Sequence, residues 1–316
     1  MQSERQRLTD PNNLSLNDFA QQLRRGGLID RLFNLARDED MGVPARDVTG
    51  ELMFSSSDTR KVCLRAREEG IASGLAFLPD LIAVFSANND LEFETHIQDG
   101  DAIEPGAALA TIQGNARELV ALERTMLNLL SRMAGIATLT HEYVRIVDGT
   151  PAQICDTRKT TPGLRVLEKY AVRCGGGTTH RLGLHDAVLI KDNHIAGLSP
   201  DEIATQLHDL AYTLRETGSS LWFVQVEVDT LDQFRGVLSV PTGVLDIVLL
   251  DNMPPQMLQE AVAMRNACES SLLLEASGGV TRGTLRSIAE SGVDRVSIGA
   301  LTHQAQSIDL GLDAVS

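Results

Sequence analysis

The sequence lacks the features of secreted and membrane-spanning proteins. Its first residues, MQSERQRLTDPNN, are charged and contain no apolar segment like that of a signal peptide. No run of about 18 apolar residues occurs, so we expect no transmembrane helix. The four cysteines are far apart and form no C-x-x-C pair, which argues against a zinc site and indicates reduced thiols. These absences predict a cytoplasmic protein.

A surplus of positive charge is also missing. The formal net charge of -15 argues against general binding to nucleic acids or to anionic membranes, because both need a basic surface. The length of 316 residues and the hydrophobic content of 43% allow a large core and one to three domains.

Basic residues are concentrated in one segment of this acidic chain. Residues 158–191 contain seven Lys or Arg and two acids, whereas the rest of the chain has 21 basic and 41 acidic residues. A local basic site of this kind suits a small polyanion. The alternative is that some of these residues, such as Arg165 and Lys169, form an exposed helix face beside Glu168.

The first half of the chain predicts helices followed by a sheet. In residues 14–41, Leu28, Leu32 and Leu35 have the spacing of a buried helical stripe. The runs KVCLRARE, LEFETHI and ALATIQG between residues 59 and 113 predict strands, most simply of an antiparallel sheet. Residues 117–134 predict a long helix that Gly135 can end.

Short apolar runs alternate with helix-length segments after residue 150. The runs are AQICDT (152–157), DAVLIK (186–191), WFVQVEV (222–228), LDIVLLD (245–251), LLLEAS (272–277) and DRVSIG (294–299). This alternation predicts parallel strands covered on both faces. At least six such units favour a (β/α) barrel over the alternative, an open doubly wound sheet.

Polar or small residues follow or end each of these runs. They are Asp156, Arg158 and Lys159; Lys191 and Asp192; Glu227; Asp251 and Asn252; Glu275, Ser277, Gly278 and Gly279; and Ser297, Gly299 and Ala300. In a parallel barrel these ends converge on one mouth, where such folds bind their substrates. The alternative for any single strand is an ordinary polar turn.

Two kinds of strand-end residue indicate binding of a phosphate group and of a cation. The loops SGG and SIGA follow the last two predicted strands, where backbone N–H groups commonly bind a phosphate. The carboxylates Glu227 and Asp251 follow apolar strands and can hold Mg²⁺, bind sugar hydroxyls or stabilise an oxocarbenium ion. Alternatively, they neutralise the basic segment.

The sequence resembles the quinolinate phosphoribosyltransferase family over residues 38–303. The matching segments are DEDMG with DVT (38–49), ERTMLNLLSRMAGIATLT (123–140), DTRKTTPGLRVLEKYAVRCGGG (156–177), HRLGLHDAVLIKDNHI (180–195), VEV (226–228), LDNM (250–253), EASGG (275–279) and SIGALTH (297–303). The resemblance implies an N-terminal α/β sandwich-like domain and an incomplete, seven-stranded parallel α/β barrel.

The resemblance also implies domain limits. We expect a flexible tail (1–13), the N-terminal domain with its linking helix 117–134 (14–135), and the barrel (136–303). A C-terminal segment, 304–316, is then expected to pack back on the N-terminal domain.

Members of this family are pentosyltransferases that join quinolinate to phosphoribosyl pyrophosphate with Mg²⁺. The products are nicotinate mononucleotide, pyrophosphate and CO2, in NAD biosynthesis. The resemblance further implies a homodimer, or a higher assembly of dimers, whose sites are shared between subunits.

The resemblance assigns roles residue by residue. Arg124 would reach into the partner's site, and Arg158, His180, Arg181 and Lys191 would bind the quinolinate carboxylates. Lys159, Glu227 and Asp251 would be the catalytic residues facing phosphoribosyl pyrophosphate, with Glu227 and Asp251 meeting the metal through water or substrate. The phosphate loops would comprise Ser277, Gly278, Gly279, Ser297, Gly299 and Ala300, with His303 nearby, and Thr157 and Ile298 complete the substrate-binding set.

Two positions depart from the family pattern. Thr179 stands where the family usually has Asn in G-G-G-x-N-H-R, and Gly279 stands where it often has Asn after Ser-Gly. Neither change removes a charge, so we expect an adjusted pocket rather than lost activity.

Three other functions match parts of the sequence less well. A same-fold paralogue linked to molybdenum uptake is disfavoured because IKDNH is retained. A lyase or aldolase with Lys191 as a Schiff base needs an apolar setting, whereas Lys191 is followed by Asp192. A biotinyl or lipoyl carrier is excluded because the turn in DGDAIEPGAALATI has no lysine.

Overall fold

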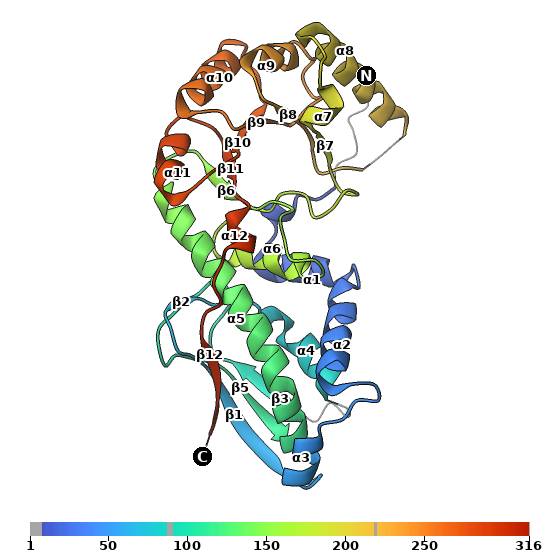
Figure 1. Ribbon diagram of the computed structural model, residues 1–316, viewed down its shortest axis with the longest axis vertical. Helices are drawn as coiled ribbons and strands as arrows, with labels where there is room; N and C mark the ends of the chain where they lie inside the picture. Colours follow the sequence, from blue (N-terminus) through green and yellow to red (C-terminus); the bar gives the residue numbers. More distant parts are fainter. Residues whose placement is uncertain (1–7, 87–90, 218–219, 316) are drawn as a thin grey trace. The chain divides into compact units, whose positions relative to one another are not determined.

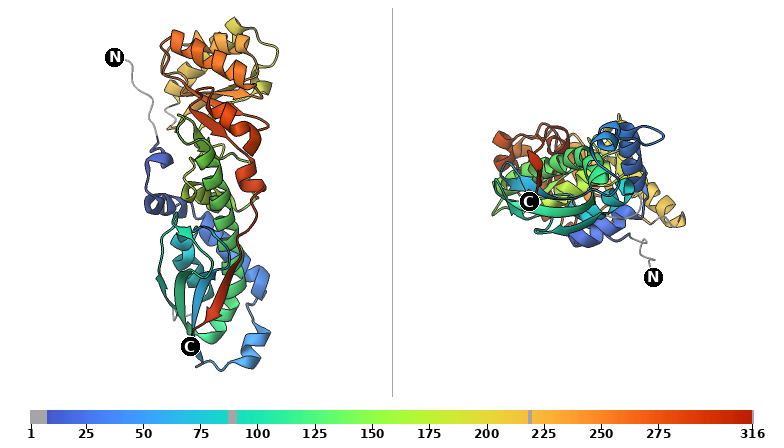
Figure 2. Two further views of the ribbon diagram at one scale, coloured as in Figure 1. Left: turned by 90° about the vertical axis from the view of Figure 1, so that its left-hand side faces the viewer. Right: turned by 90° about the horizontal axis from the view of Figure 1, so that it is seen from below.

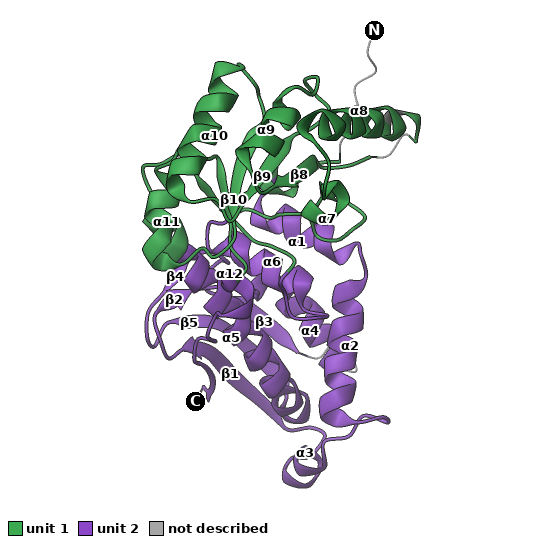
Figure 3. Ribbon diagram, turned by 45° about the horizontal axis from the view of Figure 1, so that its top comes forward, with its two compact units in different colours: residues 1–13, 142–158, 178–299 green, residues 14–141, 159–177, 300–316 purple. Residues whose placement is uncertain are grey.

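The computed structural model describes residues 8–86, 91–217 and 220–315. The chain divides into two compact units (Figure 3). Unit 1 consists of residues 1–13, 142–158 and 178–299, and unit 2 consists of residues 14–141, 159–177 and 300–316. Within the described ranges, no helix is both long and apolar enough to cross a membrane.

The two units interleave along the chain, whereas the predicted domains are continuous stretches. Segments 159–177 and 300–316 belong to unit 2, because their helices pack on each other and on an N-terminal helix of that unit. The predicted boundary at residue 135 therefore stays a prediction. Of the predicted tail, residues 1–7 lie outside the described residues, and Pro11 is buried within a short 3-10 turn, η1 (Pro11–Asn13).

Unit 1 is a parallel α/β structure. Its strands are β6 (Gln153–Cys155), β7 (Val188–Ile190), β8 (Val224–Val228), β9 (Ile247–Asp251), β10 (Leu273–Ser277) and β11 (Arg295–Ser297). Its helices are α7 (Asp192–Ile195), α8 (Pro200–Glu216), α9 (Leu231–Leu238), α10 (Pro255–Ala267) and α11 (Arg282–Ala289). All six strands match the predicted apolar runs, and α9 to α11 lie along the outside of the sheet (Figure 1).

The six strands form one sheet in the order β6-β11-β10-β9-β8-β7, and every neighbouring pair is parallel. Thr178 adds an isolated parallel bridge to Cys155 on the outer side of β6, the place of a seventh strand. The sheet is thus open between Thr178 and β7. This arrangement agrees with the predicted mixed α/β class and with an incomplete barrel.

Unit 2 contains a small antiparallel sheet and a set of helices. Its strands are β1 (Thr59–Ala66), β2 (Gly70–Ile71), β3 (Glu92–Thr95), β4 (Ala102–Ile103), β5 (Ala108–Asn115) and β12 (Leu310–Ala314). Its helices are α1 (Leu16–Arg24), α2 (Leu28–Met41), α3 (Val48–Met53), η2 (Leu75–Phe77), α4 (Leu78–Phe85), α5 (Ala116–Ile146, whose last turn enters unit 1), α6 (Arg165–Cys174) and α12 (Ala300–His303). The main sheet has the order β12-β1-β5-β3, so the C-terminal strand β12 runs beside β1 (Figure 2).

The helix predicted over residues 117–134 is longer than expected. It runs on through Gly135 to Ile146, so the prediction that Gly135 ends it is wrong. A Cβ atom at residue 135 would lie 1.8 Å from the carbonyl oxygen of Gln306. The glycine therefore serves close backbone packing in the middle of a helix, and not termination.

The predicted stripe on the second helix is also wrong. Leu28 and Leu35 of α2 are exposed, whereas Ile29 and Phe33 are buried. The helix offers two apolar stripes one position apart. Packing against α1 and α4 covers the stripe that contains the phenylalanine, which removes the larger apolar area from water.

We predict that Gly135→Ala destabilises the protein, because the added methyl group overlaps the Gln306 carbonyl and the backbone must shift. The expected loss is about 1–3 kcal/mol in the free energy of unfolding, measured by urea denaturation. Gly283→Ala is the matched control, since Gly283 lies in α11 with only one atom within 4 Å, at 3.9 Å. Equal stabilities of the two variants would contradict the packing role of Gly135.

Candidate active site

The carboxyl ends of the parallel strands lie at one edge of the sheet in unit 1. The register pairs Asp251 at the end of β9 with Ser277 at the end of β10. It likewise pairs Ser297 at the end of β11 with Cys155 at the end of β6. The structure therefore brings together strand-end residues that are more than a hundred positions apart in sequence.

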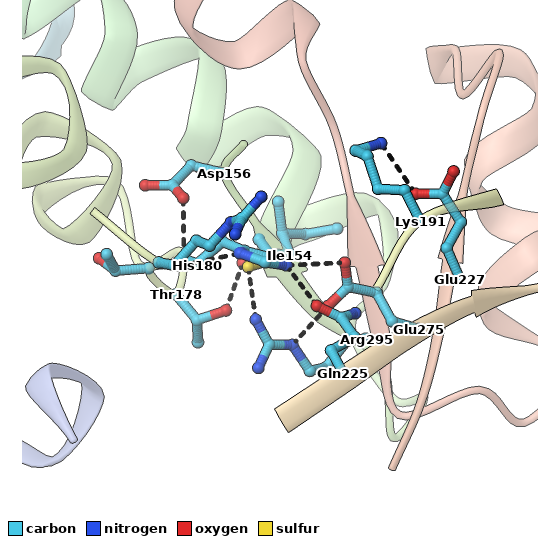
Figure 4. Close-up of polar contacts among 12 residues, drawn as sticks. Ile154, Asp156, Thr178, His180, Lys191, Gln225, Glu227, Glu275 and Arg295 are labelled. Atoms are coloured by element: carbon cyan, nitrogen blue, oxygen red, sulfur yellow. Dashed lines mark hydrogen bonds and ion pairs between the residues drawn. The ribbon is translucent and has the colours of Figure 1, made fainter. Parts of the chain in front are cut away.

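Lys191 and Glu227 form an ion pair at this edge. The Nζ atom of Lys191 lies 3.0 Å from Oε2 of Glu227, on the neighbouring strand β8 (Figure 4). Glu227 is buried, whereas the Lys191 side chain is 47% exposed. An exposed lysine paired with a carboxylate lacks the apolar setting of a Schiff-base lysine, which argues against the lyase alternative.

Arg181 and Arg158 are neighbouring cations in the same unit. Burial lowers the pKa of Arg181, and the positive charge of Arg158 lowers it further, against the opposing effect of Asp186. The Arg181 residue is only 6% exposed. Two guanidinium groups held near each other are stabilised when an anion joins them, and their planar forks match carboxylates.

The ring of His180 is buried against the strands β8 and β10 and does not lie at the exposed carboxyl ends of the strands. The residue is 5% exposed, and its amide N–H donates to Oδ1 of Asp156 over 2.8 Å. The ring nitrogen Nε2 lies 2.8 Å from Oε1 of Gln225 (Figure 4). The other ring nitrogen, Nδ1, accepts the N–H of Arg181 over 2.8 Å. Both ring nitrogens are thus engaged by protein groups.

A buried ion pair lies beside His180. Nε of Arg295 is 3.1 Å from Oε2 of Glu275, and the register pairs these two residues on β11 and β10. The N–H is not aligned on the oxygen, so the contact is one of charge rather than a hydrogen bond. Arg295 also donates to the sulfur of Cys155 over 2.8 Å. Burial alone would lower the pKa of Arg295, but Cys155 and Glu275 raise it above its ordinary value.

The glycines after β10 have different constraints. Gly278 has a φ of 92°, and a Cβ atom there would lie 2.1 Å from Oδ1 of Asn252. Gly279 has a φ of 60°, and a Cβ atom there would have no neighbour within 4 Å. Asn adopts this left-handed conformation more readily than most residues, so the usual family residue and Gly279 fit the same backbone.

Thr179 is held by its backbone. The side-chain amide of Asn12 donates to the Thr179 carbonyl over 3.0 Å, and Oδ1 of Asn12 accepts the Thr179 N–H over 2.7 Å. The Thr179 hydroxyl is buried and has no hydrogen-bond partner within the described part of the chain.

Some predicted site residues belong to unit 2. These are Arg124, Lys159, Ala300 and His303. Arg124 is an exposed residue of α5, and the carbonyl of Lys159 accepts the hydroxyl of Thr302 over 2.6 Å. In the same unit, Lys169 is fully buried, so the expectation of an exposed helix face at that position is wrong.

The remaining predicted residues lie in unit 1. They are Thr157, Ile298 and Gly299, which flank the ends of β6 and β11.

Sequence reasoning missed Gln225 and Arg295, whereas Glu275 was among the predicted strand-end residues. All three residues precede a predicted edge residue by two positions, so each lies on the same face of its strand as that edge residue. A polar residue within an apolar run, two positions before the strand end, could have identified these residues from the sequence. No sequence pattern could have identified Asn12, because it lies in a predicted tail.

Two family models match the chain. The model of the quinolinate phosphoribosyl transferase N-terminal domain matches residues 47–134, and that of the C-terminal domain matches residues 136–313. The chain belongs to the quinolinate phosphoribosyltransferase family. The strand-end residues described above are therefore those of a quinolinate phosphoribosyltransferase fold.

Curated relatives and a solved structure agree with this family. A nicotinate-nucleotide pyrophosphorylase (carboxylating) of Mycobacterium leprae is 40% identical over 84% of this chain and 90% of its own. A quinolinate phosphoribosyltransferase (decarboxylating) of Nicotiana glauca is 36% identical over 89% of this chain and 80% of its own. The nicotinate-nucleotide pyrophosphorylase structure from Francisella tularensis has a TM-score of 0.76 at 32% identity, covering 97% of this chain and 99% of that one.

We predict that Arg295→Met lowers the free energy of unfolding by about 3–5 kcal/mol, because it leaves the buried Glu275 carboxylate without its counter-charge. Urea denaturation would measure this loss. Arg235→Met is the control: Arg235 pairs with Asp232 on the surface, where such a pair contributes about 0–1 kcal/mol. A loss no greater than that of the control would show that the buried pair is not needed.

Proposed function

We propose that the protein transfers the phosphoribosyl group of phosphoribosyl pyrophosphate to quinolinate and decarboxylates the product. The products would be nicotinate mononucleotide, pyrophosphate and CO2, in the cytoplasmic de novo synthesis of NAD. The observation that carries the proposal is the pair of neighbouring guanidinium groups, Arg158 and Arg181, in an otherwise acidic chain. The names of the relatives from M. leprae and N. glauca support the same reaction.

Quinolinate carries two adjacent carboxylates on a pyridine ring. Arg158 and Arg181 would each pair with a carboxylate, and Lys191 would add a third positive charge at the end of β7. Anion binding would relieve the repulsion that lowers the pKa of Arg181. Thr157 and His180 flank this group in the chain and complete the quinolinate side of the site.

Glu227 and Asp251 would face the ribose and its pyrophosphate. Attack of the pyridine nitrogen on the ribosyl carbon breaks the bond to pyrophosphate and passes through a cation-like state. A carboxylate near that carbon stabilises the developing charge, and Lys159 would hold charge on the leaving group. These residues act by position and electrostatics, without a covalent nucleophile.

Glu227 and Asp251 would bind Mg²⁺ together with water and the phosphates of the substrate. Among the described residues, no cluster of three or more His, Cys, Asp or Glu could hold a metal alone. Mg²⁺ usually takes one or two carboxylates together with water and substrate phosphates, which is what Glu227 and Asp251 would offer. Bound there, the ion would supply charge neutralisation for pyrophosphate.

The phosphate groups would be held by the two loops after β10 and β11. The loop of Ser277, Gly278 and Gly279 offers backbone N–H groups without bulky side chains, and the loop from Ser297 through Ile298 and Gly299 to Ala300 does the same. His303 follows in α12. The close contact of Gly278 with Asn252 would fix the first loop's path.

Loss of CO2 would follow transfer of the ribosyl group. Once the pyridine nitrogen is alkylated, it carries a positive charge beside the carbon that bears one carboxylate. When the bond to that carboxylate breaks, its electron pair stays on the ring carbon, where the adjacent charge stabilises it. A proton then adds to this carbon, giving nicotinate mononucleotide.

A homodimer with shared sites, or a higher assembly of dimers, is part of the proposal. Unit 2 exposes several large apolar side chains between residues 28 and 53, which a partner subunit would cover. They are Leu28, Leu35, Val43, Val48, Leu52 and Met53. Arg124, exposed on α5 of the same unit, would reach the quinolinate site of the partner.

We predict that the purified protein forms nicotinate mononucleotide from quinolinate and not from nicotinate. Nicotinate lacks the second carboxylate, so it cannot engage both arginines. Product formation should require phosphoribosyl pyrophosphate, should stop with EDTA and should return with Mg²⁺, as measured by chromatography of the nucleotide. Turnover of nicotinate in place of quinolinate would overturn the assignment.

We further predict that Arg124→Ala and Lys159→Ala each reduce activity by at least about 100-fold, because each removes a charged contact to substrate. A mixture of the two variants should recover about one quarter of the wild-type activity, since half of the dimers formed by exchange carry one intact site. Light scattering would establish the dimer, and labelled subunits would establish exchange. No recovery after proven exchange would contradict a shared site.

A further inference from the structure

A buried carboxylate in unit 2 holds the loop that carries Lys159. Residues 159–164 form neither helix nor strand, and Lys159 itself is exposed. Glu168 of α6 is only 1% exposed, and its Oε2 accepts the backbone N–H of Thr161 over 3.0 Å. Its Oε1 accepts the hydroxyl of the same threonine over 2.8 Å. One carboxylate therefore fixes both the backbone and the side chain of Thr161, two positions after Lys159.

Arg132 of α5 joins this carboxylate to the segment that contains α12. Its Nη2 lies 3.0 Å from Oε1 of Glu168, which gives the buried carboxylate a counter-charge. Nη1 donates to the carbonyl of Ala305 over 2.6 Å, and Nη2 also donates to the carbonyl of Thr302. The planar guanidinium group presents five N–H donors in a fixed fork, so one side chain can hold all three acceptors at once.

The hydroxyl of Thr302 closes a ring of contacts. It donates to the carbonyl of Lys159 over 2.6 Å. From Lys159 the ring continues along the chain to Thr161, and it returns to Thr302 through Glu168 and Arg132. The Lys159 carbonyl and the Thr161 N–H belong to two consecutive peptide planes. Because both planes are held, the directions in which the Lys159 side chain can leave the backbone are restricted.

We propose that Glu168, Arg132 and Thr302 are positioning residues that place Lys159 for contact with the pyrophosphate of the substrate. Each of the three acts through the backbone of Lys159 and not by touching the substrate. A lysine has a flexible four-carbon side chain, so its ammonium group meets a leaving group reliably only when its backbone is placed beforehand. The role of Lys159 rests on the proposed function, whereas the ring of contacts does not.

The ring also couples Lys159 to the residues that follow β11. The short helix α12 contains Ala300 and His303, two residues of the proposed phosphate-binding region, and Thr302 lies between them. Arg132 holds the carbonyl of Thr302, while the hydroxyl of Thr302 holds Lys159. A displacement of α12 would thus be passed to the backbone of the lysine.

The first test measures the ring of contacts without any ligand. Glu168→Gln has one acceptor oxygen in place of two and no charge, so the Thr161 amide should exchange with deuterium at least about 10-fold faster. Hydrogen-exchange mass spectrometry of peptides covering residues 159–164 would measure this. Glu202→Gln is the matched control, since Glu202 accepts the N–H of Ser199 over 2.8 Å at an exposed position. Unchanged exchange at Thr161 in folded Glu168→Gln would overturn the proposal.

The second test removes one hydroxyl group and leaves the buried charges in place. Thr302→Val should raise the KM for phosphoribosyl pyrophosphate about 5- to 10-fold, because one hydrogen bond to the Lys159 carbonyl is lost. The KM for quinolinate should stay within about twofold. Thr302→Ser keeps the hydroxyl and should restore the wild-type value, and Thr205→Val, which removes an exposed hydroxyl of α8, should change neither constant. Equal constants in the Val and Ser variants of Thr302 would refute the positioning role.

The third test determines whether Thr302 acts through Lys159. In the Lys159→Ala background, Thr302→Val should reduce the remaining activity by less than about twofold, because the side chain that it positions is already gone. A further loss as large as that in the wild-type background would show that the threonine acts elsewhere, and would contradict the proposal.

Binding of inorganic pyrophosphate separates this proposal from the proposed function. Titration calorimetry with Mg²⁺ should show weaker pyrophosphate binding by Thr302→Val and wild-type binding by Thr302→Ser. If the wild-type protein binds pyrophosphate but does not convert quinolinate, the proposed function fails, and the pyrophosphate affinities decide the role of Thr302. Equal affinities of the wild type and Thr302→Val would overturn that role, as would a wild-type protein that does not bind pyrophosphate.

Discussion

The ion pair between Arg295 and Glu275 is the interaction on which the interior of the parallel sheet depends. Barrels of this kind usually fill their interior with branched apolar side chains, and an isolated charge there costs several kcal/mol. Adjacent parallel strands bring these two residues into register, so the charges compensate each other within the sheet. Gln225 and His180 lie beside this pair.

Charged residues differ in sign both along the sequence and between the interior and the edge of the sheet in unit 1. The chain as a whole carries a net charge of -15. The interior of unit 1 holds the Arg295–Glu275 pair, and the edge of its sheet holds Arg158, Arg181 and Lys191. Lys191 has a counter-charge in Glu227, and Arg181 has one in Asp186. A dianion with two adjacent carboxylates complements such an edge, whereas a monoanion leaves repulsion between the arginines unrelieved. Substrate size and charge are therefore set by the same arrangement.

The sequence predicted the strands far better than the helix contacts. Apolar runs with polar ends identify β6 to β11 because most residues of these strands are buried or partly buried, and the resulting apolar run is a local feature of the sequence. Gly135, by contrast, looks like a helix end until the backbone of Gln306 is seen beside it. The buried stripe of α2 and the burial of Lys169 likewise depend on partners distant in sequence. Periodicity shows that a face is apolar, but only tertiary packing selects which of two adjacent faces is covered.

The two departures from the family pattern have different physical meanings. At Gly279 the backbone has a φ of 60°, a conformation open to both Gly and Asn, so the replacement keeps the path of the loop. At Thr179 the backbone is fixed from outside, because Asn12 bonds both its N–H and its carbonyl. This chain thus has Thr at residue 179, where the family usually has Asn, and the side chain of Asn12 holds the backbone of that residue in place. Since His180 follows directly, the clamp by Asn12 and the contact with Gln225 fix the same turn from two sides.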